Sequence, residues 1–120
     1  MPDTGVQLDH FSVVLLILRP DAPILDDAAA ARLQDAHMAH LAGLHEGGYL
    51  IAAGPLSDEK FRGLNILNVK PETARVLAEQ DPAVLAGRFS VKVIPWIVPR
   101  GAVSYSRTRF PRSVSRLSES

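Results

Sequence analysis

The chain of 120 residues contains no cysteine. This absence excludes disulfide bonds, thiolate nucleophiles and cysteine-based zinc or iron–sulfur sites. Long apolar runs are also missing, because the longest, Val13 to Leu18, is far too short to span a bilayer. The first ten residues, MPDTGVQLDH, lack the basic and hydrophobic regions of a signal peptide. We therefore expect a soluble cytoplasmic protein.

The chain has no net formal charge, so its overall electrostatics favour neither nucleic acid nor a membrane as partner. The positive charge is concentrated, however, in the segment from Arg100 to Ser120, which holds five of the 13 basic and one of the 13 acidic residues. This serine- and arginine-rich segment predicts a flexible tail, 102–120, after a single domain, 1–101. Tyr105 and Phe110 lie among the arginines, which leaves nucleic-acid contact as a weak alternative that the acidic remainder of the chain disfavours.

Hydrophobic residues make up 47% of the chain, enough for the core of one domain. Short apolar stretches predict strands, and a run of alanines and leucines that stops at Gly47-Gly48 predicts a long helix. Pro71 suits the first turn of a second helix, Pro82 starts a short turn, and Pro95 interrupts the last strand. The predicted strands cover 10–18, 49–54, 63–69 and 88–98, and the predicted helices cover 28–48 and 71–80.

The order of these elements is β-α-β-β-α-β, the ferredoxin-like pattern of the α+β class with a four-stranded antiparallel sheet. Val13 to Leu18 is apolar at odd and even positions, so both faces of this strand should be covered. Two helices cover only one face, and a chain of this length has nothing left for the other. We therefore predict a homodimer that packs sheet to sheet.

Three of the four histidines, His37, His40 and His45, lie close together on the first predicted helix. At 100° per residue, His37 falls in the middle of a leucine stripe, while His40 and His45 point about 60° and 80° to either side. Surface positions explain these two flanking histidines. For His37 two interpretations remain: a core histidine satisfied by a backbone carbonyl, or a residue that transfers protons.

A metal site is the weakest explanation of the histidine cluster. His45 lies about 12 Å along the helix axis from His37 and cannot share its ion. His37 and His40 are spaced for a shared ligand, but Asp58 or Glu59 would have to complete the site, and no pattern fixes their position. We therefore expect no metal. A nucleotide cofactor is also not expected, since GGYLIAAG leads into a strand rather than a helix.

Several short motifs in order resemble the YciI-like family over about residues 10–101. They are a histidine early in the first helix, a glycine before the second strand, a Gly-Pro at its end, a following aspartate, and an Asp-Pro before the last strand. In this chain they correspond to His37, Gly48, Gly54-Pro55, Asp58 and Asp81-Pro82. The loop before the first helix and the tail fall outside the resemblance.

The resemblance implies a ferredoxin-like fold paired into a dimeric α+β barrel, with the histidine and an aspartate in a pocket between helix and sheet. It also implies an enzyme, since at least one kind of member eliminates HCl from a chlorinated aromatic compound. Relatives on the same fold include muconolactone isomerases and cofactor-free monooxygenases.

From these observations we predict a cofactor-independent lyase or isomerase that acts on a small, aromatic or enol-containing metabolite. His37 would act as general base or acid and Asp58 would orient it. Asp81 is interpreted as a structural cap of the turn at Pro82. A non-catalytic small-molecule binder remains the alternative. The residues predicted to contact the substrate are Gly54, Pro55, Arg62 and Trp96.

Overall fold

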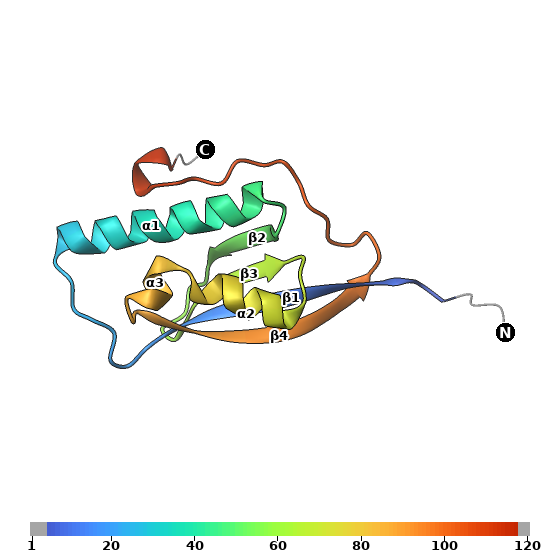
Figure 1. The fold of residues 1–120 in the computed structure, drawn as a ribbon, viewed down its shortest axis with the longest axis horizontal. Helices are drawn as coiled ribbons and strands as arrows, with labels where there is room; N and C mark the ends of the chain where they lie inside the picture. The colour runs from blue at the N-terminus through green and yellow to red at the C-terminus, as the bar shows by residue number, and fades with distance from the viewer. Residues whose placement is uncertain (1–4, 118–120) are drawn as a thin grey trace.

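A computed structural model describes residues 5–117. Two terminal stretches lie outside the described part. They are residues 1–4, which begin the segment compared with a signal peptide, and residues 118–120, which end the predicted tail. The elements follow the predicted order β-α-β-β-α-β, and the short turn predicted at Pro82 forms a helical turn before the last strand (Figure 1). They are β1 (Leu8–Leu18), α1 (Asp27–Glu46), β2 (Leu50–Pro55), β3 (Phe61–Leu67), α2 (Pro71–Glu79), α3 (Pro82–Leu85) and β4 (Phe89–Pro99), followed by a short 3₁₀ helix, η1 (Val114–Arg116).

The four strands form one antiparallel sheet in the order β2-β3-β1-β4, which confirms the predicted ferredoxin-like α+β fold. β1 is central and pairs along its whole length with β4, from Leu8 opposite Pro99 to Leu18 opposite Phe89. β4 runs on through Pro95, where an interruption was predicted. The reason is that β4 is an edge strand, where a proline can sit with its missing N–H directed away from the ladder.

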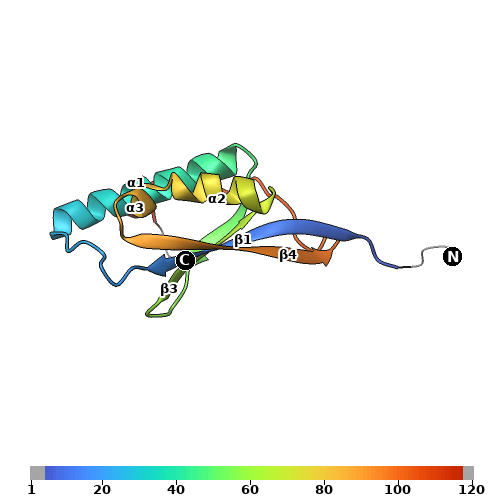
Figure 2. The ribbon, with the colours of Figure 1, turned by 60° about the horizontal axis from the view of Figure 1, so that its bottom comes forward.

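All three helices lie on one face of the sheet (Figure 2). On this face Val14 and Leu16 of β1 are fully buried together with Leu50 and Leu67 of the neighbouring strands. The buried helix residues of this core are all alanines, Ala74, Ala78 and Ala83, and leucines of α1 and α2 pack against it half-buried. In the described part of the chain, no helix is long and apolar enough to cross a membrane.

The opposite face of the sheet has no helix over it (Figure 2), and the strand register makes it mostly apolar. Phe11, Ile51 and Val98 form a small buried cluster at one end, covered in part by Val103. The rest of this face is half-buried or exposed, and its strand positions alternate as the pleat requires. It carries Val13, Leu15, Ile17, Leu64, Ile66, Ile94 and Trp96, and also the polar Ser90 and Lys92 of β4, which pair with Ile17 and Leu15.

The sheet-to-sheet homodimer remains a prediction, and this open face would be its interface. Val13 lies at the centre, with Ile66 and Ile94 as its cross-strand neighbours. The change Val13→Lys is expected to convert a dimer into a monomer, because the charge would be buried without a partner. Sedimentation velocity measures this. The control is Val76→Lys on α2, an exposed valine on the helix side. A dimer that survives Val13→Lys would place the interface elsewhere.

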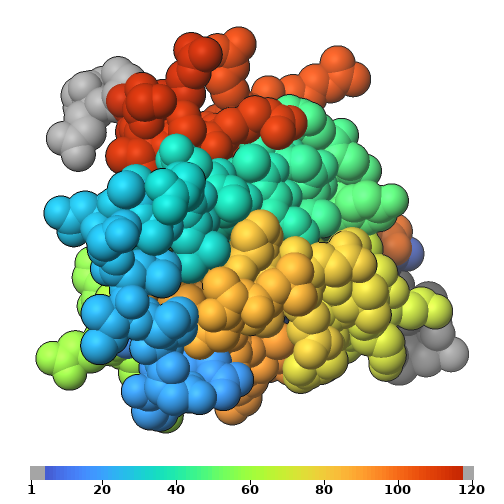
Figure 3. Space-filling model, turned by 60° about the vertical axis from the view of Figure 1, so that its left-hand side comes forward, coloured from blue at the N-terminus to red at the C-terminus, as the bar shows by residue number. Residues whose placement is uncertain are grey.

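The C-terminal segment packs against the outer flank of α1 instead of projecting away from the domain. It leaves β4 and runs back along the helix, and we term residues 102–117 the C-terminal strap (Figures 1 and 3). Arg112 forms an ion pair with Glu46 at 2.7 Å, and the backbone N–H of Val114 donates to the carboxylate of Asp35 at 2.9 Å. The strap is thus anchored along much of the helix.

Candidate functional site

His37 faces the sheet from the middle of α1, as the helical angles predict. Its ring is largely covered, with a side-chain exposure of 12%. The edge of the ring meets Phe89 at the start of β4, with the ring centroids 6.2 Å apart and an interplanar angle of 65°. The leucines of the same stripe, Leu33, Leu41 and Leu44, pack into the core. These contacts hold the imidazole in one orientation.

Asp81 is the partner of His37. It lies at the entry to α3, where its Oδ1 accepts a hydrogen bond from the backbone N–H of Ala83 at 2.9 Å. The predicted role of Asp81 as a cap is therefore confirmed. The other oxygen, Oδ2, lies 2.6 Å from Nδ1 of His37. Asp81 is 1% exposed. One buried carboxylate therefore caps α3 and also fixes the position of His37.

The hydrogen bond fixes which ring nitrogen of His37 is available for chemistry. When Asp81 is ionised and the imidazole neutral, Nδ1–H donates to the carboxylate and Nε2 carries the lone pair. Within residues 5–117, Nε2 makes no hydrogen bond. Every fully buried side-chain nitrogen or oxygen in these residues has a hydrogen-bond partner, so Nε2 is not fully buried. Nε2 therefore keeps some exposure to solvent, and its lone pair can accept a proton.

The prediction that Asp58 orients His37 is wrong. Asp58 is exposed in the β2–β3 loop, and its Oδ2 accepts from the backbone N–H groups of Phe61 and Lys60 at 2.8 and 2.9 Å. These two hydrogen bonds, that from Phe61 first, hold the pKa of Asp58 below its usual value. The loop belongs to a hairpin that extends past the sheet on the side away from the helices (Figure 2). Asp58 therefore stabilises its own turn.

The other two histidines of α1 have separate partners. Nε2 of His40 lies 3.0 Å from the carbonyl oxygen of Leu77 on α2. His45 was expected at the surface but is only 4% exposed, because Tyr105 and Phe110 of the strap stack on its two sides. Within the described residues, no group of three or more histidine, cysteine or acidic side chains is placed to hold a metal ion.

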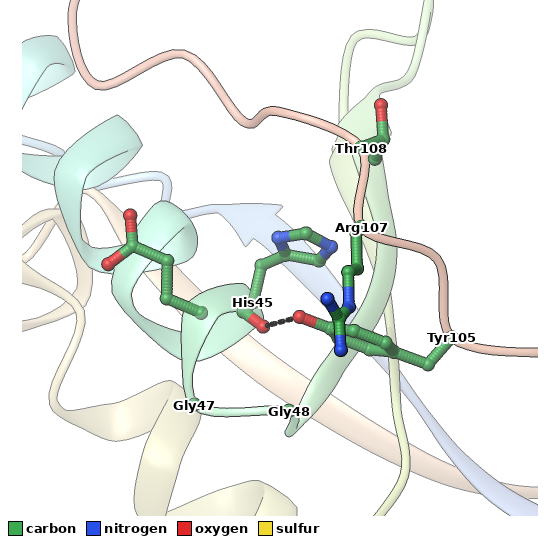
Figure 4. Close-up of a pocket in the computed structure, with 7 residues that line it drawn as sticks. His45, Gly47, Gly48, Tyr105, Arg107 and Thr108 are labelled. Atoms are coloured by element: carbon green, nitrogen blue, oxygen red, sulfur yellow. Dashed lines mark hydrogen bonds between the residues drawn. The ribbon is translucent and has the colours of Figure 1, made fainter.

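The contacts of His45 show why it is buried (Figure 4). Its ring lies 4.8 Å from that of Tyr105 and 4.3 Å from that of Phe110, nearly parallel to both. Nε2 lies 2.7 Å from the carbonyl oxygen of Ser106, and the Tyr105 hydroxyl donates to the carbonyl oxygen of His45 at 2.6 Å. These contacts give His45 a structural role, the attachment of the strap to α1.

A cavity of about 340 Å³ lies between the first half of α1, α3 and the start of β4, and neither His37 nor Asp81 is part of its lining. Leu33 on its wall is one helical turn before His37, and Ala83 is the residue capped by Asp81. Leu25, from the loop that lies outside the family resemblance, forms part of its rim. Arg88 also lines it and places its guanidinium 5.1 Å from the centre of the Phe89 ring. Sequence reasoning missed Arg88, because an arginine at the start of a strand carries no distinctive signal.

The predicted substrate contacts do not gather around His37. Gly54 and Pro55 end β2, as predicted, and no hydrogen bond or ring contact joins them to His37 in the described structure. Arg62 donates to the carbonyl oxygen of Glu59 within the hairpin. Trp96 lies seven residues along β4 from Phe89, about 23 Å at 3.3 Å per residue. It lines a different cavity, at the far end of the sheet. Substrate contact by these four residues stays a prediction.

Comparisons with known proteins support the ferredoxin-like fold described above. No curated protein gives a significant match to the chain. Among solved structures, the chain is similar to 5-chloro-2-hydroxyhydroquinone dehydrochlorinase from Burkholderia phenoliruptrix AC1100, determined in complex with 2,5-dihydroxybenzoquinone. The two share 20% identity with a TM-score of 0.54, and the match covers 72% of this chain and 92% of the other. The YCII-related domain matches residues 13–97. The chain therefore belongs to the YCII-related family.

Proposed function

We propose that this protein is a cofactor-independent lyase or isomerase that moves a proton on a small aromatic or enol-containing compound. The observation that carries the proposal is the 2.6 Å contact between Nδ1 of His37 and a buried carboxylate, with Nε2 left partly exposed to solvent. A buried carboxylate at this position fixes the tautomer and stabilises the imidazolium that forms when Nε2 takes a proton. This arrangement needs no redox group.

The proposed reaction begins when Nε2 of His37 removes a proton from a hydroxyl or an acidic carbon of the substrate. In a lyase, the electrons of the broken bond form a new double bond and expel a leaving group such as chloride. In an isomerase, His37 returns the proton to a different carbon. Arg88, whose guanidinium lies over the Phe89 ring that contacts His37, would hold the phenolate or enolate that develops.

The structurally similar protein supports this class of chemistry, because it is a dehydrochlorinase and its structure contains a dihydroxybenzoquinone. A dehydrochlorination removes a proton and a chloride ion from one molecule, which a single positioned base can perform. The two proteins share only 20% sequence identity, so the shared fold does not identify the substrate of this chain.

The test is incubation with a panel of chlorinated hydroquinones, hydroxyquinols and enol-lactones. Mass spectrometry and chloride release would detect a lyase, and deuterium incorporation in D₂O would detect an isomerase. We expect product or exchange with at least one member of the panel. Binding without product or exchange would contradict the proposal and favour the alternative, a non-catalytic binder.

A further inference from the structure

Asn65 is a buried asparagine in the middle of β3 whose amide has no partner. The residue is only 4% exposed. Within residues 5–117 its side chain forms no hydrogen bond or ion pair. Because every fully buried side-chain nitrogen or oxygen in this part of the chain has a partner, the small remaining exposure of Asn65 includes its amide atoms. The amide is therefore almost completely buried and yet reaches a space that solvent can enter.

The neighbours of Asn65 in the sheet give its amide nothing to bind. Asn65 pairs with Val14 of β1 on one side and with Ala53 of β2 on the other. The adjacent positions of β3 on the same face of the pleat are Gly63 and Leu67. None of these four side chains carries a polar atom. An unpartnered amide among them costs free energy that an apolar side chain of the same size would not cost, so the fold alone does not explain the asparagine.

The side chain of Asn65 lies on the helix-covered face of the sheet. Its cross-strand neighbours Val14 and Ala53 both belong to the core under the helices. β1 and β2 each run antiparallel to β3, which lies between them in the sheet. Since α1 connects β1 to β2, it crosses over β3, as in other split βαβ units. The amide of Asn65 is therefore directed towards α1.

His37 lies on α1 at nearly the same level as Asn65 on β3. The backbone N–H of Tyr49 donates to the carbonyl oxygen of Leu44 at 3.0 Å, and β2 then begins beside Leu67. The last turn of α1 and the tip of β3 thus lie at the same end of the sheet (Figure 1). His37 precedes Leu44 by about 10 Å along the helix axis, which corresponds to about three residues of a strand. Counted back from Leu67, this distance reaches the residue before Asn65.

The space between Asn65 and α1 is not filled from the sheet. Gly63 has no side chain and Ala53 contributes only a methyl group. Above them, Nδ1 of His37 is held by Asp81 at the entry to α3, which packs on β4 at the opposite edge of the sheet from β2. Nε2 lies on the other side of the ring from this contact and faces away from α3. A base and an unpartnered amide thus border the region between α1 and β3.

We infer that Asn65 is a ligand-contact residue of the His37 site and that its amide binds a hydroxyl or carbonyl oxygen of an uncharged ring compound. The ligand lies between α1 and β3, with this oxygen at Asn65 and its acidic proton near Nε2 of His37. An amide offers N–H donors and an oxygen acceptor without charge, so it selects by hydrogen bonding and not for an anion. The inference rests on the proposed function in placing the ligand beside His37, and it adds the residue that recognises the ligand.

The experiment follows the side-chain amide signals of Asn65 in ¹H–¹⁵N spectra of the full-length protein during titration with phenol. Asn65 and Asn68 are the only asparagines of the chain, so each signal can be assigned from its own leucine variant. We expect a saturable shift of the Asn65 signals, and the ring ¹⁵N signals of His37 should follow the same binding curve. The signals of Asn68, which is exposed, should stay in place.

Toluene, which has the shape of phenol without its hydroxyl, is titrated in parallel. In Asn65→Leu the ratio of phenol affinity to toluene affinity should fall about tenfold, the effect of one lost hydrogen bond. The Tm of Asn65→Leu should be equal to that of the unmodified chain or higher, because no hydrogen bond of the fold is removed. Asn65→Ala removes the amide without adding volume and should lower the ratio equally, which keeps the test valid if leucine does not fit.

The matched control is Asn68→Leu, which makes the same change three residues further on and should leave the ratio unaltered. The titration involves no turnover, so a shift at Asn65 with the expected loss in its variants supports the contact even if the substrate panel gives no product. The inference is overturned if phenol leaves the Asn65 signals unmoved, if the His37 signals do not follow the same curve, or if the Asn65 variants keep the ratio of the unmodified chain.

Discussion

Replacing His37 by alanine is expected to lower kcat by about 10²- to 10⁴-fold, the usual contribution of a positioned general base. The side chain removed is the one whose Nδ1 is held by Asp81 and whose Nε2 keeps some exposure to solvent. The measurement is steady-state turnover of whichever compound the substrate panel identifies. Circular dichroism and sedimentation should show an unchanged fold and assembly.

The matched control for this change is His40→Ala. His40 lies one turn further along the same helix, and its Nε2 bonds the carbonyl oxygen of Leu77 rather than a carboxylate. The change His40→Ala should lower the free energy of unfolding modestly and should alter kcat by no more than a few-fold. Turnover that survives His37→Ala, or an equal loss in both variants, would show that His37 is not the base.

Two replacements of Asp81 are expected to separate its structural from its chemical role. Asp81→Ala leaves the N–H of Ala83 and Nδ1 of His37 without an acceptor, and we expect it to lower the free energy of unfolding by about 2–4 kcal/mol. Asp81→Asn keeps an amide oxygen that can still accept from Ala83, so its stability should fall less. Urea denaturation measures both values.

The activity of the Asp81→Asn variant should nevertheless fall by about 10²- to 10⁴-fold. Its amide nitrogen would face Nδ1 of His37 and donate to it, which forces the proton of the ring onto Nε2 and removes the base. The control is Asp58→Asn, because Asp58 is the carboxylate that the sequence predicted to orient His37. A larger loss of kcat in Asp58→Asn than in Asp81→Asn would show that Asp58, and not Asp81, is the partner of His37 in catalysis.

The error over Asp58 has a physical cause. The sequence places Asp58 21 residues after His37, just beyond a strand that must lie close to the helix. The direction in which a hairpin leaves a sheet, however, depends strongly on the twist of its strands, which the local sequence pattern does not give. The hairpin bends away from the helices, while Asp81, 44 residues from His37, is brought back by α2 and α3.

His45 illustrates a second limit of the pattern. Helical angles separated it correctly from the leucine stripe of His37, and a histidine off that stripe is ordinarily solvent-exposed. The strap arrives from about 60 residues downstream and covers that flank with two aromatic rings. Periodicity within α1 cannot reveal a cover that comes from a distant segment without periodicity of its own.

The sequence by itself determined the order of the elements, the ferredoxin-like sheet, the apolar character of both sheet faces and the inward direction of His37. These properties are local, since they follow from the spacing of apolar residues and from helix and turn signals within each element. Only the tertiary structure decided which carboxylate meets His37, where Trp96 lies relative to it and what the strap covers. Those outcomes depend on how the chain returns to itself over 44 to 61 residues, and the sheet's twist and the path of its connections set that return.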